Sequence, residues 1–261
     1  MFSAVPGRVL GALVGVAGAL IAAFVLAPRL LANRAGADFG GEDDLRHAFG
    51  AAFVDYWHSG TREFSAELGN IVDYWFRYHL AKAVLAALLL AVLGTLAVLL
   101  WRRFMAADGL GTRVALAVSG GVATVLALCS LVLVLANVQG TVAPFASLLP
   151  MVTGEVRAEV SLRLADGTRT PPLEVMLDDF ARYHLAMAVL AAVTAASPLG
   201  ACALLWRTRR RSADGRSRRV FAAFVALSAV SALALIVVAV ANTTNASDPV
   251  PGLAALFTGG W

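Results

Sequence analysis

Two histidines occur in matching sequence contexts, and histidine is a common ligand for haem iron and transition metals. His79 ends the segment DYWFRYH and His184 ends DDFARYH, and a long apolar run follows each of them. If both runs cross a membrane in the same direction, the two side chains lie at the same depth on equivalent helices. The pair would then be placed to bind a haem or a quinone between the two helices.

The same histidines also have a structural interpretation. A Tyr-His pair beside an arginine at the end of an apolar run is typical of an interfacial anchor, with His79 packed on Trp75 and His184 on Phe180. The chain has no HxxxH, CxxC, HExxH, P-loop, GxGxxG or GxSxG motif. The sequence therefore indicates no catalytic residue and no metal site, and it leaves the identity of any cofactor open.

The similarity between the two contexts extends well beyond the histidines. An offset of 105 residues superposes Trp101-Arg102 on Trp206-Arg207, and Asn137 on Asn242, without a gap. Each copy has a polar segment, an apolar helix, an arginine-rich turn and a second apolar helix that ends in Asn. We interpret the pattern as a tandem duplication of a two-helix unit, with a first two-span repeat at 72–150 and a second, including the C-terminal tail, at 177–261.

Composition predicts the fold class. With 59% hydrophobic and 15% charged residues, the chain is too apolar for a soluble domain of 261 residues. Runs without Asp, Glu, Lys or Arg, long enough for the roughly 20 residues that a membrane helix needs, lie at 9–28, 83–101, 114–137, 183–206 and 220–242. Continuous apolar runs favour helices over membrane strands. We therefore predict an all-α integral membrane protein with five transmembrane helices and a mainly helical outer domain.

The arginines predict the orientation. With a cytoplasmic N-terminus, the inner side holds eleven arginines against only Asp108 and Asp214. Short arginine-rich loops stay inside, so five spans place the C-terminus outside. The basic loop at 207–219 is then a topology signal and a contact for anionic membrane lipids, and we expect no nucleic-acid binding. Abundant Ala and Arg with a single Lys suggest a bacterial gene, and hence the bacterial plasma membrane.

Residues 1–36 are predicted to form the first transmembrane helix as an uncleaved anchor. Three small residues recur at intervals of four and leave a stripe suited to close helix packing: Gly7, Gly11 and Gly15. A cleaved signal peptide is the alternative, because Arg8, an apolar core and the small residues at 35–37 resemble its three parts.

The outer segment 37–78 is predicted to form amphipathic helices. Apolar residues recur there at steps of three and four up to Ser59-Gly60: Leu45, Phe49, Ala52, Phe53 and Tyr56. A second helix begins after Thr61 and nothing breaks it before Trp101. The aromatic residues around Trp75 form either a membrane-interface belt or, less simply, a binding box.

Three further features complete the expectations. In the outer loop 151–176, apolar residues alternate from Val156 to Leu164 before Asp166-Gly167, which predicts a strand and a short hairpin. Two acid–arginine pairs at a spacing of four should pair on one helix face, or join in a network between the copies: Asp73 with Arg77, and Asp178 with Arg182. Pro198, in the middle of a span, predicts a kink that either fits neighbouring helices or opens a lateral pocket for a lipid or quinone.

Two classes of function remain. The first is a non-catalytic accessory, scaffold or lipid-associated subunit that offers its outer helices, or its first transmembrane helix, to protein partners in the envelope. The second is a small membrane redox protein that binds haem or quinone through His79 and His184. No feature of the sequence favours a channel for an uncharged solute. Lys82 borders the second span, and apart from His184 near the start of the fourth the predicted spans contain no acid, base or histidine, which disfavours a proton-coupled transporter.

Overall fold

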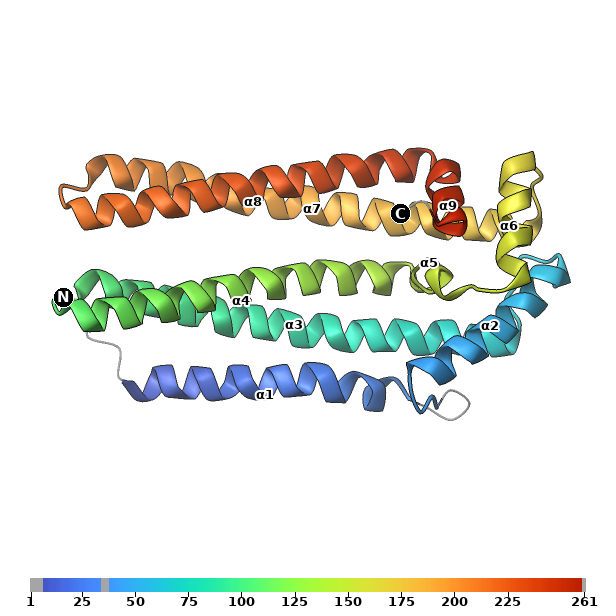
Figure 1. Ribbon diagram of the computed structural model, residues 1–261, viewed down its shortest axis with the longest axis horizontal. Helices are drawn as coiled ribbons and strands as arrows, with labels where there is room; N and C mark the ends of the chain where they lie inside the picture. The colour runs from blue at the N-terminus through green and yellow to red at the C-terminus, as the bar shows by residue number, and fades with distance from the viewer. Residues whose placement is uncertain (1–6, 34–37, 260–261) are drawn as a thin grey trace. The chain divides into compact units, whose positions relative to one another are not determined.

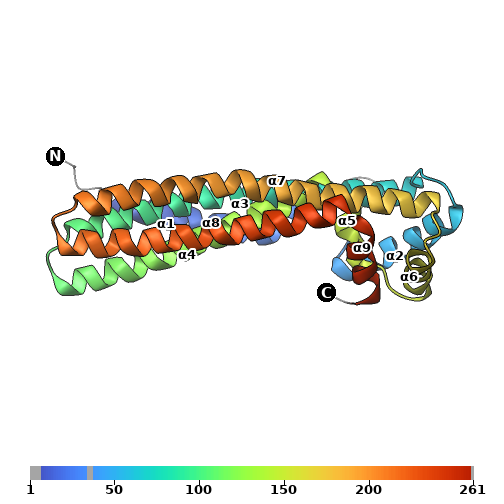
Figure 2. The ribbon, with the colours of Figure 1, turned by 90° about the horizontal axis from the view of Figure 1, so that it is seen from above.

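The computed structural model describes residues 7–33 and 38–259, and all regular structure in those ranges is helical (Figures 1 and 2). The five long helices are α1 (Gly7–Ala32), α3 (Ala66–Ala106), α4 (Leu110–Val142), α7 (Pro171–Arg211) and α8 (Gly215–Ser247). Each is long and apolar enough to cross a membrane, as the sequence predicted. The shorter helices are α2 (Glu42–Ser59), α5 (Pro144–Leu148), α6 (Glu155–Asp166) and α9 (Pro249–Thr258), with a 3-10 turn, η1, at Leu149–Met151.

The hairpins α3–α4 and α7–α8 have equal helix lengths. The helices α3 and α7 each have 41 residues, and α4 and α8 each have 33. Every one of these helices begins and ends 105 residues from its counterpart. The same offset relates the prolines that begin α5 and α9, Pro144 and Pro249. The same succession of two long helices and one short helix therefore occurs twice.

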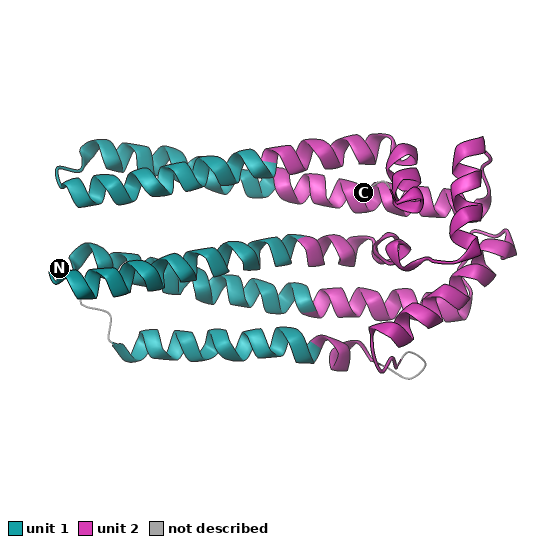
Figure 3. Cartoon of the chain, in the orientation of Figure 1, with its two compact units in different colours: residues 1–27, 82–135, 193–235 teal, residues 28–81, 136–192, 236–261 magenta. Residues whose placement is uncertain are grey.

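The chain divides into two compact units (Figure 3). Unit 1 comprises residues 1–27, 82–135 and 193–235, and unit 2 comprises residues 28–81, 136–192 and 236–261. The four hairpin helices contribute residues to both units.

Unit 2 has the larger hydrophobic core. In it α2, α5, α6 and α9 pack with the unit 2 residues of α3 and α7. The face of α2 that the sequence predicted is the buried one, and Phe53 and Tyr56 are fully enclosed. The ring of Phe145 on α5 lies 6.3 Å from that of Phe53 and 4.8 Å from that of Phe64. The predicted amphipathic helix at this position is thus confirmed.

The hairpin predicted in 151–176 is wrong, because residues 155–166 form α6. Val156, Val160 and Leu164 are buried, whereas Leu162 is 67% exposed. The apolar residues alternate, but they also recur every four positions, and a helix with that period buries one face against α9. Gly167 adopts a left-handed conformation (φ 74°) and ends the helix. The apparent hairpin turn is therefore a helix C-cap.

The glycine stripe of α1 meets no other helix among the described residues, so close packing on it stays a prediction. In unit 1, α1 contacts α3 and α4 through larger side chains: Leu10, Leu13, Ala17 and Leu20. A Cβ added at Gly7, Gly11 or Gly15 would meet no atom within 4 Å. The leucine face offers more contact area, so it is the face that packs. The alternative cleavage site at 35–37 lies outside the described residues.

The helix α7 continues through Pro198 in unit 1. Because proline lacks an N–H, one backbone carbonyl in the preceding turn has no helical donor. The kink stays a prediction.

Candidate functional site

Each of the two histidines contacts an asparagine of the next long helix, within unit 2. The Nδ1 atom of His79 on α3 lies 3.0 Å from Oδ1 of Asn137 on α4. The Nδ1 atom of His184 on α7 lies 2.8 Å from Oδ1 of Asn242 on α8. The sequence aligned the asparagines but suggested no role for them. A polar side chain at the end of an apolar run needs a hydrogen-bond partner when it is buried, and that signal points to this pairing.

The hydrogen bonds of Asn242 assign the tautomer of His184. The Nδ2 group of Asn242 donates to the carbonyl oxygen of Val238 at 2.8 Å, so Oδ1 faces the imidazole as an acceptor. The Nδ1 atom of His184 must therefore donate, and Nε2 carries the lone pair. His184 is only 5% exposed, and within the described ranges Nε2 has no hydrogen-bond partner. An imidazole whose Nδ1–H is held by an oxygen has the orientation that proteins give to a metal-ligating histidine.

Aromatic rings enclose both imidazoles. The ring of Trp75 lies 4.7 Å from that of His79, and the ring of Phe180 lies 4.4 Å from that of His184, both edge to face. These contacts confirm the expected packing of His79 on Trp75 and of His184 on Phe180. On the His79 side the backbone of α4 also approaches closely, because a Cβ at Gly140 would lie 2.9 Å from three atoms of the imidazole.

Asp179 is a structural residue that the sequence analysis missed. It is 8% exposed, accepts the backbone N–H of Ala146 at 2.8 Å and pairs with Arg182 at 3.0 Å. Nearby, Nε2 of Gln139 donates to the carbonyl oxygen of Tyr183 at 3.1 Å. These bonds hold α4 and α5 against α7. Asp179 follows the buried Met176 by three positions, and residues at that spacing share one face of a helix. This spacing was the signal that could have indicated a buried aspartate.

The predicted pairing of Asp178 with Arg182 is wrong. Arg182 pairs with Asp179, while Oδ2 of Asp178 lies 3.0 Å from Nη2 of Arg62 in the linker before α3. In the first hairpin, Nε of Arg77 donates to the carbonyl oxygen of Ala32 at 3.0 Å, and no ion pair with Asp73 is found among the described residues. The pair of Arg62 and Asp178 is half exposed and contributes at most about 1 kcal/mol.

Within the described part of the chain, no group of three or more His, Cys, Asp or Glu side chains is arranged to hold a metal ion. Comparison with protein-family models, with curated proteins and with solved structures found no match. The function must therefore be inferred from the residues and their contacts.

Proposed function

We propose that the protein is a non-catalytic, multi-pass accessory or scaffold subunit of the bacterial plasma membrane, with its N-terminus in the cytoplasm. Unit 2 would then be the outer helical domain that meets protein partners. One observation carries the proposal: polar groups in and near the two histidine segments hold unit 2 together. Both histidine Nδ1 atoms face asparagines, Asp179 holds α5, and Gln139 holds α7. Polar atoms that are hydrogen-bonded to one another in this way stabilise the fold of a scaffold and are not available to contact a substrate.

We infer further that the two hairpins arose by tandem duplication. The equal helix lengths, the constant offset of 105 residues and the recurrence of the His–Asn contact support this origin. A duplicated hairpin enters the membrane in the same direction as the original. Both arginine-rich turns would then lie on the cytoplasmic side and both His–Asn pairs toward the outside.

The exposed face of α6 is our candidate for the partner contact. Leu162 is 67% exposed, while the opposite face of the helix is fixed on the core through Val160. The helix is also held to α9, because the guanidinium of Arg157 donates to the carbonyl oxygens of Leu256 and Phe257 at 2.6 and 2.9 Å. A rigid helix with an exposed leucine suits docking to a protein.

Native gel electrophoresis of mildly solubilised membranes tests the proposal. The wild-type chain should migrate in an assembly larger than its own 27.2 kDa, and Leu162→Arg should release it. The control is Leu110→Arg, since Leu110 is 78% exposed at the start of α4, on the predicted opposite side of the membrane. If wild-type chain and both variants migrate alike, the proposed contact is wrong.

A redox protein that binds haem or quinone is the second candidate. The observation that favours it is the buried Nε2 atom of His184, whose lone pair has no partner among the described residues. A visible absorption spectrum of the purified protein tests this function for haem, and extraction with organic solvent tests it for quinone. A Soret band that is lost in His79→Ala/His184→Ala, and kept in the exposed control His47→Ala, would overturn the non-catalytic proposal.

A further inference from the structure

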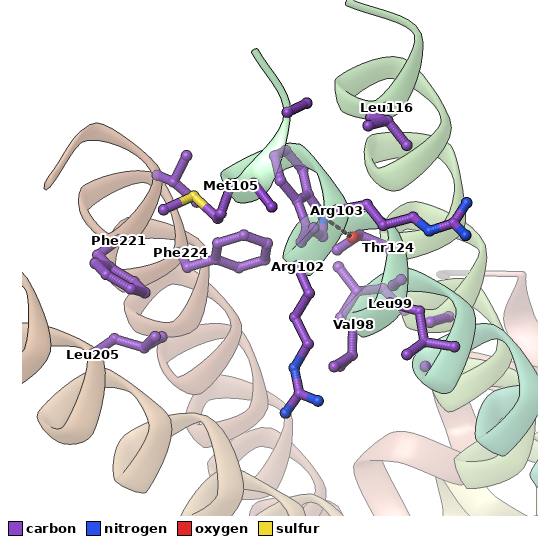
Figure 4. A pocket seen from close by; sticks show the side chains of 18 of the residues that line it. Val98, Leu99, Arg102, Arg103, Met105, Leu116, Thr124, Leu205, Phe221 and Phe224 are labelled. Atoms are coloured by element: carbon purple, nitrogen blue, oxygen red, sulfur yellow. Dashed lines mark hydrogen bonds between the residues drawn. The ribbon is translucent and has the colours of Figure 1, made fainter. Parts of the chain in front are cut away.

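A cavity of about 1220 Å³ lies in unit 1, where α3, α4, α7 and α8 contribute its walls. Figure 4 shows two apolar sides, with Leu205, Phe221 and Phe224 on one and Val98, Leu99 and Leu116 on the other. Arg102 and Arg103 are the charged residues of the lining. The lining is therefore apolar except at the two arginines, and in Figure 4 Arg102 extends between the apolar sides whereas Arg103 extends away from them.

The polar groups of the wall are already bonded to one another. Nε1 of Trp101 donates to the hydroxyl of Thr124 at 3.1 Å, and that hydroxyl donates to the carbonyl oxygen of Gly120 at 2.7 Å. Trp101 also packs edge to face on Phe224, with ring centroids 5.2 Å apart. The polar groups of this part of the wall therefore do not require a polar ligand. A polar or charged group of a ligand would bind to the arginines instead.

The charge around the cavity is strongly positive. The two arginine-rich turns, at 102–113 and 207–219, contain only two acids. Asp108 lies 3.9 Å from Arg113, and Asp214 accepts hydrogen bonds from the backbone and hydroxyl of Ser217. Both acids thus have partners other than Arg102, which is exposed and extends between the two apolar sides in Figure 4. An anionic ligand would complement this charge.

The length of the apolar wall matches one membrane leaflet. Leu90 and Arg102, the ends of the lining's run on α3, are twelve helical steps apart, or about 18 Å at 1.5 Å per residue. Half of a hydrocarbon core of about 30 Å is about 15 Å. An acyl chain can therefore lie along the wall with its phosphate at the level of the guanidinium groups.

We propose that this cavity binds one anionic phospholipid of the cytoplasmic leaflet, with an acyl chain against α3 and α4 and the phosphate at Arg102, while Arg103 adds to the positive charge of the lining. Basic pockets between membrane helices recognise anionic headgroups in this way. An uncharged quinone would not neutralise the guanidinium charge of Arg102. The assignment rests on the proposed membrane orientation, but it does not depend on the proposed partner contact at Leu162.

Native mass spectrometry of protein released from nanodiscs tests the site. The nanodiscs contain equal amounts of phosphatidylglycerol and phosphatidylethanolamine, and the measured quantity is the ratio of the two lipids retained. The wild-type protein should retain one phosphatidylglycerol in preference. Arg102→Gln/Arg103→Gln should lower that preference about tenfold, which corresponds to about 1.4 kcal/mol.

The matched control is Arg218→Gln/Arg219→Gln, which removes the same charge from exposed residues that do not line the cavity. If both double variants lose the preference equally, the lipid is attracted by surface charge alone and the site is wrong. A wild-type protein without preference, or one that retains a quinone, also overturns it. A second variant, Leu128→Trp, fills the cavity without changing charge and should reduce retention of both lipids.

The unfolding midpoint of each variant in detergent shows whether it is folded. A variant that loses the lipid preference should still migrate in the same assembly on the native gel as the wild-type chain. A failure of the lipid site is therefore distinguishable from a failure of the scaffold proposal.

Discussion

The two hairpins have the same helix lengths but differ at their arginine-rich turns. In α3–α4, Trp101 bonds to Thr124 and packs on Phe224. Its counterpart Trp206 is 40% exposed, with the guanidinium groups of two neighbouring arginines 5.0 and 5.2 Å from the ring centre. In the most apolar segment of α3, 39% of the residues are buried, against 17% in α7. In this segment the first hairpin is therefore the more buried of the two, and the second exposes more of its surface.

The His–Asn contacts differ in their surroundings. His184 is buried, whereas His79 is only partly buried. The backbone of α4 covers the ring of His79 at Gly140, but the equivalent position in α8 is Asn245, whose side chain lies beside Gly252 of α9. The His–Asn contact is thus common to both hairpins, whereas the surroundings of the two histidines differ.

The largest difference should appear on substitution of the two tryptophans. Trp101→Ala removes a hydrogen bond and a packed ring, which we expect to cost about 3 kcal/mol of unfolding free energy. Trp206→Ala should cost less than about 1 kcal/mol, because that ring is held only by exposed arginines. Unfolding in mixed detergent micelles measures both values. Equal losses would show that the two arginine-rich turns stabilise the protein equally.

The next effect concerns the backbone approach at His79. Gly140→Ala places a methyl group 2.9 Å from the imidazole, so α4 must move away from α3. Overpacking of this kind costs about 2 kcal/mol. The control is Asn245→Ala at the equivalent position in α8, which should change stability by less than about 0.5 kcal/mol. If Gly140→Ala is as stable as the wild-type protein, the close contact does not constrain the hairpin.

The third comparison concerns the asparagine contact itself. Asn242→Ala leaves Nδ1 of the buried His184 without its acceptor, at a cost of about 1.5 kcal/mol. Asn137→Ala should cost less, because His79 is more exposed. A double-mutant cycle of Asn242→Ala with His184→Ala isolates the bond, and a coupling energy near zero would show that the contact contributes nothing. Thr243→Ala, next to Asn242 and exposed, is the control.

The sequence predicted the features that depend on a single helix. Apolar run lengths located all five long helices, and spacing located the buried face of α2. It did not predict α6, because its apolar residues fit both a strand and a helix, and contact with α9 decides between the two periods. The same limit applies to Asp179: spacing places it on a buried face, but only the approach of α5 gives it a partner. The cavity likewise depends on side chains from four helices, whose mutual arrangement no periodicity encodes.

The smallest effect should come from Pro198, which stands where the first hairpin has Leu93. Pro198→Leu restores a backbone N–H inside α7, and the regained hydrogen bond should raise the unfolding free energy by about 1 kcal/mol. The control is Val193→Leu in the same helix, 70% exposed, which should leave stability unchanged. A loss of stability in Pro198→Leu would mean that α7 is kinked and that its neighbours pack against the kink. The second hairpin would then differ from the first in its backbone as well as in its side chains.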